Sequence, residues 1–262
     1  MDLGLKNKVA FVCASSKGLG KASALELAKE GAHVVLTGRD EKELQETKKQ
    51  LQSLTESEVE YVVCDLTKKE DIENAVRYTI EKFNRIDILI NNSGGPPSGT
   101  FEQFTDEDWY QSFELNLLSY VRCIRAVLPY MKEQNYGKII NLTSTSIKQP
   151  IPGLLLSNTF RTGVMGLSKT LATELAGFNI LVNTVAPGRI LTDRVQTLDS
   201  IKAEKTGMSL EEVQNHSKKS IPLGRYGKPE EFGAVVAFIA SDKCSYVTGT
   251  SIIIDGGMVK SI

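Results

Sequence analysis

Residues 9–20 read Val-Ala-Phe-Val-Cys-Ala-Ser-Ser-Lys-Gly-Leu-Gly, and this stretch decides the fold. Its first five residues are apolar and suit a buried strand, and the small residues after them suit a turn into a helix. Small residues let backbone N–H groups approach a phosphate, and the start of a helix adds positive partial charge. An ordinary turn is the alternative, but its place after the first strand of an alternating chain favours a dinucleotide site.

Beyond this stretch, apolar runs alternate with helical patterns, which indicates a parallel sheet covered on both faces. The expected strands are Val9–Cys13, Val34–Thr37, Val59–Val63, Ile86–Asn91, Lys138–Leu142, Ile180–Val185 and Ser251–Ile254. The expected helices lie near Gly18–Glu30, Lys42–Leu54, Lys69–Phe83, Asp106–Lys132, Leu155–Ala176 and Pro229–Ala240. We therefore predict an α/β fold: a single Rossmann-type domain over residues 1–262, with a doubly wound, seven-stranded parallel sheet and helices on both faces.

One long insertion interrupts this alternation. Residues 189–226 are polar and rich in charge, and they follow the end of an expected strand. We expect a mobile flap over the ligand. Its apolar residues either shape a cleft or pack a helix on its own scaffold: Leu191, Val195, Leu198, Ile201, Met208, Leu210 and Val213.

Composition limits the partners. The 31 basic and 32 acidic residues leave a net charge near zero, which argues against the basic stripe of a nucleic-acid binder. No apolar run approaches the roughly 20 residues of a membrane span, and the first residues lack the apolar core of a signal peptide. We expect a soluble cytoplasmic protein that binds a small molecule, with neither nucleic acid nor membrane as partner.

The cysteines and histidines do not suggest a metal site. Cys13, Cys64, Cys123 and Cys244 lack the spacing of metal ligands, and the chain has only two histidines. Each cysteine lies in or beside an apolar run, as buried free cysteines do. We expect no metal and inert, buried thiols.

The end of the second expected strand, Leu36-Thr37-Gly38-Arg39-Asp40, bears on the choice of nucleotide. A dinucleotide site reads the adenosine ribose at this position, usually with an acidic residue that accepts from a 2′-hydroxyl. Here Gly38 stands in that place, while Lys17 and Arg39 could meet a 2′-phosphate. We therefore favour NADP(H) over NAD(H), although Asp40 points the other way and both cations also suit an ordinary solvated surface.

A second informative stretch runs from Asn141 to Glu174. Thr143 to Ser146 place four hydroxyls at the end of an expected strand, where open α/β sheets bind ligands. After a proline-broken loop, a helix carries Ser157 and Arg161 four residues apart, hence on one face. We interpret this stretch as the active-site segment.

With these residues assembled, the chain resembles the short-chain dehydrogenase/reductase family over nearly its whole length. The matching motifs occur in order: Asp65-Leu66, Asn91-Asn92-Ser93-Gly94, Asn116, Ser144, Pro187-Gly188 with Ile190 and Thr192, Pro222-Leu223-Gly224-Arg225, Val247-Thr248-Gly249 and Asp255-Gly256-Gly257. The last three of these motifs resemble the C-terminal part of family members such as 3-oxoacyl-acyl-carrier-protein reductases. It implies hydride transfer between a nicotinamide cofactor and a carbonyl or secondary alcohol, and a homotetramer or homodimer.

The resemblance also implies which residues form the site. The catalytic candidates are Asn116, Ser144, Ser157 and Arg161. The cofactor-binding candidates are Ala14, Ser16, Lys17, Gly18, Leu19, Gly20, Arg39, Asp65, Leu66, Asn92, Gly94, Arg161, Pro187, Gly188, Ile190 and Thr192.

Two positions depart from the family pattern. The glycine motif normally opens with Thr-Gly, whereas this chain has Cys13-Ala14; alanine is accommodated if that position does not need a positive φ. The family's catalytic Tyr-x-x-x-Lys is replaced by Ser157 and Arg161, and the sequence after them stays in family register.

The second departure changes the acid–base chemistry. Lowering the pKa of a tyrosine from about 10 to about 7 takes about 4 kcal/mol, which a neighbouring cation can supply. A serine hydroxyl has a far higher pKa than a tyrosine, and lowering it to the same value would need about 12 kcal/mol, which is beyond protein sites. Ser144 and Ser157 therefore polarise a carbonyl only as neutral donors, with protons from water or Lys148. Two hypotheses stay open: an atypical oxidoreductase, or a dinucleotide-binding sensor or inactive partner subunit.

Overall fold

Seven apolar segments pair into one parallel sheet in the computed structural model, which describes residues 1–261. The strands are β1 (Val9–Val12), β2 (His33–Gly38), β3 (Val59–Val63), β4 (Ile88–Asn91), β5 (Gly137–Leu142), β6 (Ile180–Pro187) and β7 (Ser251–Ile254). Their order is β3-β2-β1-β4-β5-β6-β7, with every neighbouring pair parallel. The predicted Rossmann-type fold is confirmed, and each predicted strand end lies within two residues of the observed one.

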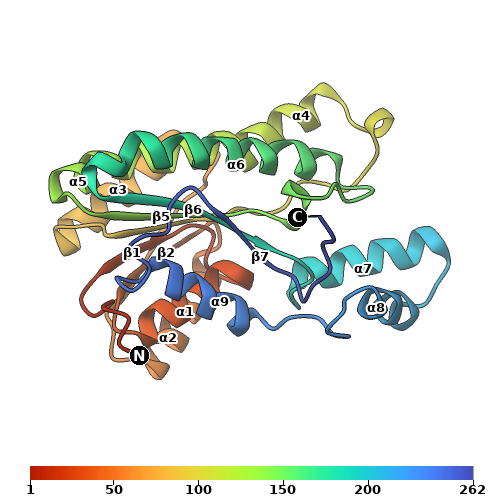
Figure 1. The fold of residues 1–262 in the computed structure, drawn as a ribbon, viewed down its shortest axis with the longest axis horizontal. Helices are drawn as coiled ribbons and strands as arrows, with labels where there is room; N and C mark the ends of the chain where they lie inside the picture. Colours follow the sequence, from red (N-terminus) through yellow and green to blue (C-terminus); the bar gives the residue numbers. More distant parts are fainter. Residues whose placement is uncertain (262) are drawn as a thin grey trace.

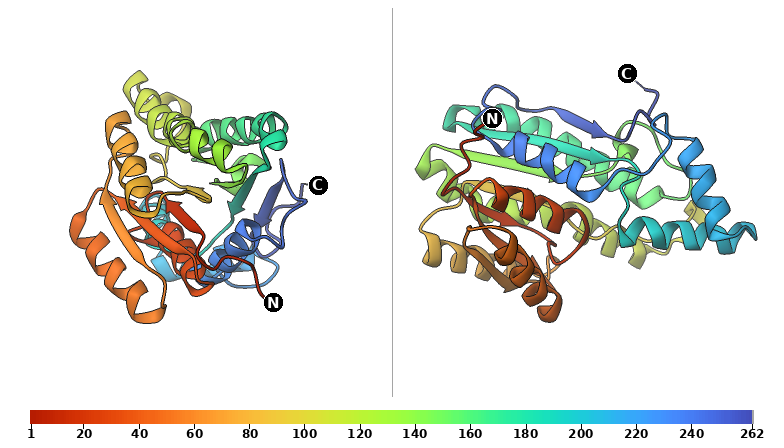
Figure 2. Two further views of the ribbon diagram at one scale, coloured as in Figure 1. Left: turned by 90° about the vertical axis from the view of Figure 1, so that its left-hand side faces the viewer. Right: turned by 90° about the horizontal axis from the view of Figure 1, so that it is seen from below.

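Helices cover both faces of the sheet (Figures 1 and 2). One layer contains α1 (Gly18–Lys29), α2 (Glu41–Leu54) and α9 (Pro229–Ala240), and the other contains α3 (Lys69–Phe83), α5 (Ser119–Gln134) and α6 (Leu155–Leu175). Each layer packs its own apolar cluster against the sheet, the first through Leu27, Leu44 and Phe232 and the second through Ile72, Val127 and Leu175. Because both faces of the strands are buried, the strands read as near-continuous apolar runs.

The predicted helix at Asp106–Lys132 is not regular. It consists of α4 (Asp106–Phe113), a π-helical turn over Glu114–Leu118, and α5. Single π turns insert one extra residue into a helix and often occur at functional sites. Here the turn contains Asn116, which is fully buried and directed toward the loop after β4. Sequence periodicity did not reveal this local change.

The predicted flap, residues 189–226, folds into α7 (Asp193–Thr206) and α8 (Leu210–Lys219). Both helices lie beyond the carboxyl ends of the central strands (Figure 1). At the base of the segment, Arg189 forms an ion pair with the fully buried Asp199, which also accepts a hydrogen bond of 2.7 Å from the Tyr226 hydroxyl. These contacts tie both ends of the insertion to α7.

The strand order reverses direction between β1 and β4, and open α/β sheets bind ligands beside such a switch point. The loops after β1, β4, β5 and β6 therefore meet at one edge of the sheet. Within residues 1–261, no helix is both long enough and apolar enough to cross a membrane.

Candidate active site

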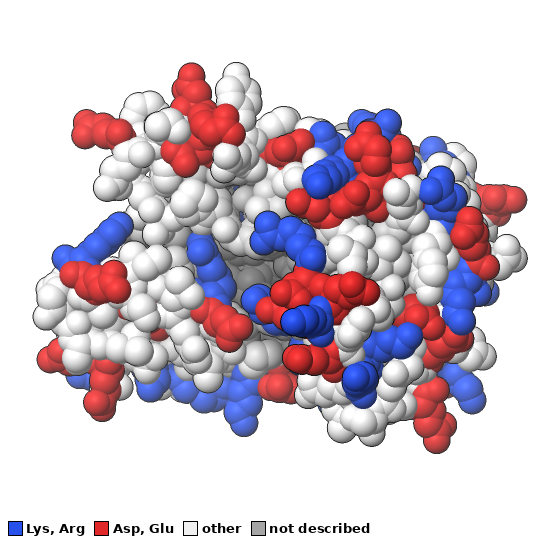
Figure 3. Space-filling view, turned by 180° about the vertical axis from the view of Figure 1, so that it is seen from behind, with Lys and Arg blue, Asp and Glu red and all other residues white. Residues whose placement is uncertain are grey.

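A cavity of about 980 Å³ lies at the carboxyl ends of the strands and extends under α7. Its size is at the upper end of the roughly 300–1,000 Å³ typical of small-molecule sites. Figure 3 shows one face of the molecule hollowed near its middle, with basic and acidic side chains around the hollow. Most of the predicted site residues line this cavity: Ala14, Ser16, Lys17, Gly18, Leu19, Arg39, Asp65, Leu66, Asn92, Gly94, Ser144, Ser157, Arg161, Pro187, Gly188, Ile190 and Thr192.

Two predicted residues, Gly20 and Asn116, support the cavity from behind its wall. A Cβ atom at Gly20 would lie 2.4 Å from the Ala14 carbonyl oxygen, so only glycine permits this approach of α1 to the preceding turn. The Asn116 amide donates to Gly94 O at 2.6 Å and to Ser93 Oγ at 2.9 Å. Asn116 thereby fixes the loop after β4, while its own Oδ1 has no hydrogen-bond partner within residues 1–261.

The turn after β1, residues 13–20, forms what we call the nucleotide cradle. Ala14 has φ of +45°, so the condition under which alanine would fit without strain is not met. A left-handed conformation costs a non-glycine residue about 1–2 kcal/mol. The turn is held by Asn92, whose amide donates to Ala14 O at 3.1 Å. Because Lys17 makes no side-chain cap at the start of α1, the first N–H groups of the helix remain available to an anion.

One end of the cavity contains Lys17 and Arg39, the two cations predicted to meet a 2′-phosphate, together with a carboxylate that the sequence did not single out. Glu43 in α2 accepts from Lys17 Nζ and from Ser16 Oγ, both at 3.0 Å. Arg39 is exposed at the rim. Burial acts to raise the pKa of Asp65, but hydrogen bonds from Thr67 and the charges of Arg39 and Lys68 together lower it below its usual value. A 2′-phosphate at this position would meet two cations but would compete with Glu43 for Lys17.

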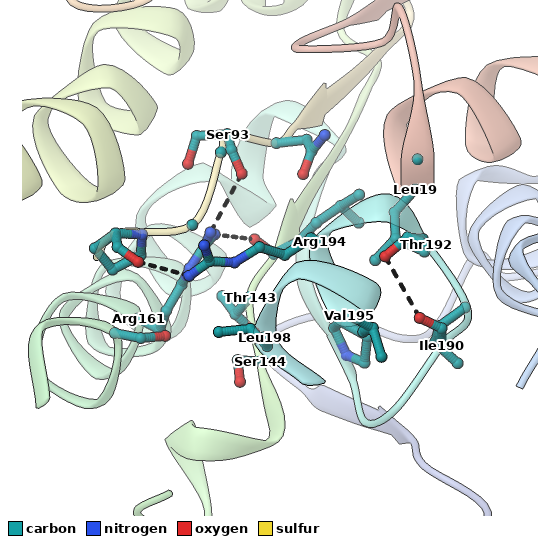
Figure 4. A pocket seen from close by; sticks show the side chains of 18 of the residues that line it. Leu19, Ser93, Thr143, Ser144, Arg161, Ile190, Thr192, Arg194, Val195 and Leu198 are labelled. Atoms are coloured by element: carbon teal, nitrogen blue, oxygen red, sulfur yellow. Dashed lines mark hydrogen bonds between the residues drawn. The ribbon is translucent and has the colours of Figure 1, made fainter. Parts of the chain in front are cut away.

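Arg161 is 5% exposed and is hydrogen-bonded to three groups of the protein. Its Nη1 donates to the Tyr120 hydroxyl at 2.6 Å and to Leu142 O at 2.8 Å, and its Nη2 donates to Ser93 O at 3.3 Å. The guanidinium thus bridges the ends of β4 and β5 at the edge of the cavity (Figure 4). Burial raises the pKa of Tyr120, although the charge of Arg161 acts in the opposite direction, so the hydroxyl of this tyrosine stays neutral. Tyr120 is not among the residues that line the cavity.

Ser144 and Ser157 both line the cavity, but they form no hydrogen bond with each other. Ser144 Oγ accepts from the backbone N–H of Ser146 at 3.2 Å, and Ser157 Oγ has no partner within residues 1–261. Two free hydroxyls can donate to a carbonyl oxygen. Lys148, the other proton source considered, is exposed and lies outside the cavity lining.

Arg194 is a cavity residue that the sequence did not indicate. It extends from the first turn of α7 across the cavity, where its Nη2 donates to Pro96 O at 2.6 Å (Figure 4). A Cβ atom at Gly95 would lie 2.9 Å from the Arg194 Nε atom, so the guanidinium passes directly over this glycine. Burial lowers the pKa of Arg194, and the nearby charge of Arg161 lowers it further. The guanidinium remains charged near neutral pH.

Of the apolar residues in the insertion, Val195 and Leu198 line the cavity, whereas Val213 is completely buried within the insertion. Some apolar residues of the insertion thus shape the cavity, and others pack its helices on their own scaffold, so each of the two alternatives holds for part of the segment. The four cysteines are buried, as predicted, and burial raises the pKa of Cys64 above its usual range. Of the four, Cys64 alone lines the cavity.

These residues fit a nicotinamide dinucleotide. The cradle at Gly20 accepts no side chain, the start of α1 is open, and the cavity continues from the cradle to Ser144 and Ser157. Arg161 uses three of its five N–H donors on the protein, which leaves donors for a ribose or a substrate.

Known proteins match this chain over nearly its whole length. The family model described as "Enoyl-(Acyl carrier protein) reductase" matches residues 13–259. The 3-oxoacyl-acyl-carrier-protein reductase FabG of Thermotoga maritima is 38% identical over 97% of this chain and 99% of its own length. The uncharacterized oxidoreductase YvrD of Bacillus subtilis is 34% identical over the whole of both chains.

Among solved structures, the L-sorbose reductase of Gluconobacter frateurii, complexed with NADPH and L-sorbose, superposes with a TM-score of 0.95. It is 33% identical, and the match covers 100% of each chain. The shared fold, the ordered motifs and these identities together place the protein among the oxidoreductases of the short-chain dehydrogenase/reductase family, to which this chain belongs.

Proposed function

We propose that the protein is an atypical NADP(H)-linked oxidoreductase that transfers hydride between the nicotinamide and a carbonyl or secondary alcohol. The observation that supports this most is the continuous cavity, in which the nucleotide cradle and the hydroxyls of Ser144 and Ser157 face the same space. The relatives named as reductases and the NADPH in the sorbose reductase structure support the same reaction class.

The proposed chemistry depends on neutral donors. The bound cofactor supplies or accepts the hydride. Ser144 and Ser157 donate hydrogen bonds to the carbonyl oxygen, and the positive charge of Arg161 stabilises the alkoxide that develops there. Arg161 cannot deliver a proton, because an arginine guanidinium stays protonated in proteins. The alkoxide is therefore protonated by water, which predicts a slower reaction than one with a tyrosine acid.

We propose that NADP(H) binds in preference to NAD(H), because Lys17 and Arg39 flank the place of the adenosine ribose and no acidic residue follows β2 before Asp40. The test is an equilibrium titration of NADPH and NADH with the wild type and the Arg39→Ala variant. Loss of a phosphate contact should weaken NADPH about three- to tenfold and leave NADH unchanged. Unchanged NADPH affinity in the variant would remove Arg39 from the proposal.

Three further features remain expectations from the family resemblance. Residues 189–226 act as a substrate flap, the protein is a homotetramer or homodimer, and it works in the cytoplasm. Light scattering tests the second expectation, and a monomer at micromolar concentration would contradict it.

The second candidate function is a dinucleotide-binding protein without turnover, acting as a sensor or as an inactive partner subunit. Two observations favour it: three of the five Arg161 donors are already bonded to the protein, and Ser157 has no hydrogen-bond partner that would activate it.

One experiment separates the two functions. NADPH oxidation is followed with a panel of carbonyl compounds that includes 3-oxoacyl thioesters, while NADPH affinity is measured by fluorescence in the same preparation. The oxidoreductase predicts saturable turnover with at least one carbonyl. Tight NADPH binding without turnover across the panel would favour the sensor.

A further inference from the structure

Two guanidinium groups, those of Arg161 and Arg194, reach the same cavity from opposite sides. Arg161 comes from α6 and is bonded to the ends of β4 and β5, whereas Arg194 comes from α7 and is bonded to the loop after β4. Figure 4 shows both side chains directed toward the space between these elements. The cavity therefore has a positively charged wall beside the hydroxyls of Ser144 and Ser157.

Neither guanidinium has an anionic partner within residues 1–261. Four carboxylates also line the cavity, namely Asp40, Glu43, Asp65 and Asp193, but none of them bonds to Arg161 or Arg194. By contrast, Arg189 at the base of the same insertion is paired with a buried carboxylate. Leaving a partly buried charge unpaired is costly, so the two free guanidiniums call for an explanation.

The hydrogen-bonding capacity of the pair is also largely unused. A guanidinium has five N–H donors. Arg161 directs three of them to protein acceptors, and Arg194 directs one to Pro96 O. The remaining donors suit the planar oxygens of a carboxylate or the oxygens of a phosphate, which arginine binds through two parallel hydrogen bonds.

We propose that Arg161 and Arg194 form a binding site for an oxyanion carried by the substrate, so that the substrate is a carbonyl compound with a carboxylate or phosphate group near the reacting carbon. This inference rests on the proposed function, since it names the substrate class of the same cavity. The apolar side chains of Val195 and Leu198 line the remaining wall and suit the uncharged part of such a molecule.

The same pair of cations could meet a second source of oxyanion, the diphosphate of the cofactor. The two sources are distinguished by measuring nucleotide and substrate affinities separately. The probes are benzoylformate and its uncharged methyl ester, which carry the same ketone and ring but differ in the carboxylate. Their binding is measured by calorimetry, with and without saturating NADP⁺, so that the result does not depend on turnover.

The key variant is Arg194→Gln, with Lys205→Gln as its matched control. Lys205 belongs to the same helix, is exposed and lies outside the cavity lining, so its loss changes the net charge equally. A second variant, Gly95→Ala, keeps the charge but displaces the guanidinium, because the new methyl group would lie within 2.9 Å of it. Thermal unfolding of each variant checks that the fold is retained.

The proposal predicts that the wild type binds benzoylformate about tenfold or more tightly than the ester, and that Arg194→Gln and Gly95→Ala abolish this difference while Lys205→Gln keeps it. NADPH affinity should stay within about twofold in all variants. Equal binding of acid and ester by the wild type would overturn the proposal. So would a loss of NADPH affinity in Arg194→Gln with acid discrimination intact, because that result assigns the cations to the cofactor diphosphate. Absence of turnover with intact acid discrimination would instead contradict only the proposed oxidoreductase.

Discussion

The nucleotide cradle and the reaction side of the cavity, by which we mean Ser144, Ser157 and Arg161, lie in one space but depend on different kinds of atoms. The cradle uses backbone N–H groups and close approach, as at Gly20, where no side chain fits. The reaction side uses side-chain functional groups. A substitution in the cradle therefore changes backbone strain and packing, whereas a substitution on the reaction side changes the functional groups available for acid–base chemistry.

The departures from the family pattern illustrate this difference. The positive φ of Ala14 costs about 1–2 kcal/mol in backbone strain, yet Ala14 O still accepts the hydrogen bond from Asn92 that holds the turn. Ser157 and Arg161 fit their helix without backbone strain, but they leave the site without a titratable acid. Cofactor binding and turnover are thus separable properties of this cavity, and each can be changed while the other is measured.

The largest expected effect comes from restoring the reaction side with Ser157→Tyr and Arg161→Lys together. A positioned general acid contributes about 10²- to 10⁴-fold, so carbonyl reduction should rise by that order while NADPH affinity changes little. The rate is followed by NADPH oxidation, with the two single variants as controls. Each single variant should gain much less, because the tyrosine needs the lysine to lower its pKa.

No gain in the double variant, with NADPH still bound, would contradict this separation of binding from chemistry. It would mean that another residue lining the cavity, such as Arg194, blocks the productive position of the carbonyl.

On the cradle side, Gly20→Ala should weaken NADPH binding about tenfold or more, because the methyl group meets the Ala14 carbonyl oxygen at 2.4 Å and must displace backbone. The matched control is Gly166→Ala in α6, where a Cβ atom has no neighbour within 4 Å. That control should leave NADPH affinity unchanged and raise helix stability by up to about 1 kcal/mol. Fluorescence titration measures the affinities. Equal NADPH affinity in the wild type and Gly20→Ala would show that the cradle does not depend on close approach.

Sequence patterns located the sheet and most of the cavity, because strand composition and motif order are local properties. The predicted bounds of β3, α3 and β7 match the structure to the residue. The residues after β1, β4, β5 and β6 line one cavity, because the carboxyl ends of parallel strands meet at one edge of the sheet.

What the sequence could not provide depends on the direction of single side chains and on backbone angles. Arg194 reaches Pro96 across 98 positions of sequence, and no periodicity encodes such a contact. The positive φ of Ala14 is imposed by the turn and not by the residue. Glu43 appeared only as one charge of an amphipathic helix, although its carboxylate lies beside Lys17.

Glu43 offers a finer test of the cradle. Glu43→Gln removes a negative charge from the place of a 2′-phosphate and frees Lys17, so NADPH affinity should rise about two- to fivefold, while NADH affinity should not change. The gain is small because both side chains of this ion pair are exposed. Titration with both nucleotides at low and high salt measures it, and high salt should reduce the gain. The same gain for NADH would show that Glu43 opposes the dinucleotide as a whole, and not the phosphate.

The smallest effect expected is that of Ala14→Gly on stability. Glycine should relieve about 1–2 kcal/mol of backbone strain at φ of +45° in the folded state. It also increases the conformational entropy of the unfolded chain, which lowers the free energy of unfolding by about 0.4–1 kcal/mol. The free energy of unfolding should therefore rise by about 0.5 kcal/mol, as measured by urea denaturation. Ala126→Gly in the first half of helix α5 is the control and should lower it by about 0.5–1 kcal/mol. If both variants lost the same stability, the turn would store no strain at Ala14, and the cradle would tolerate alanine for a reason other than the rigidity of its surroundings.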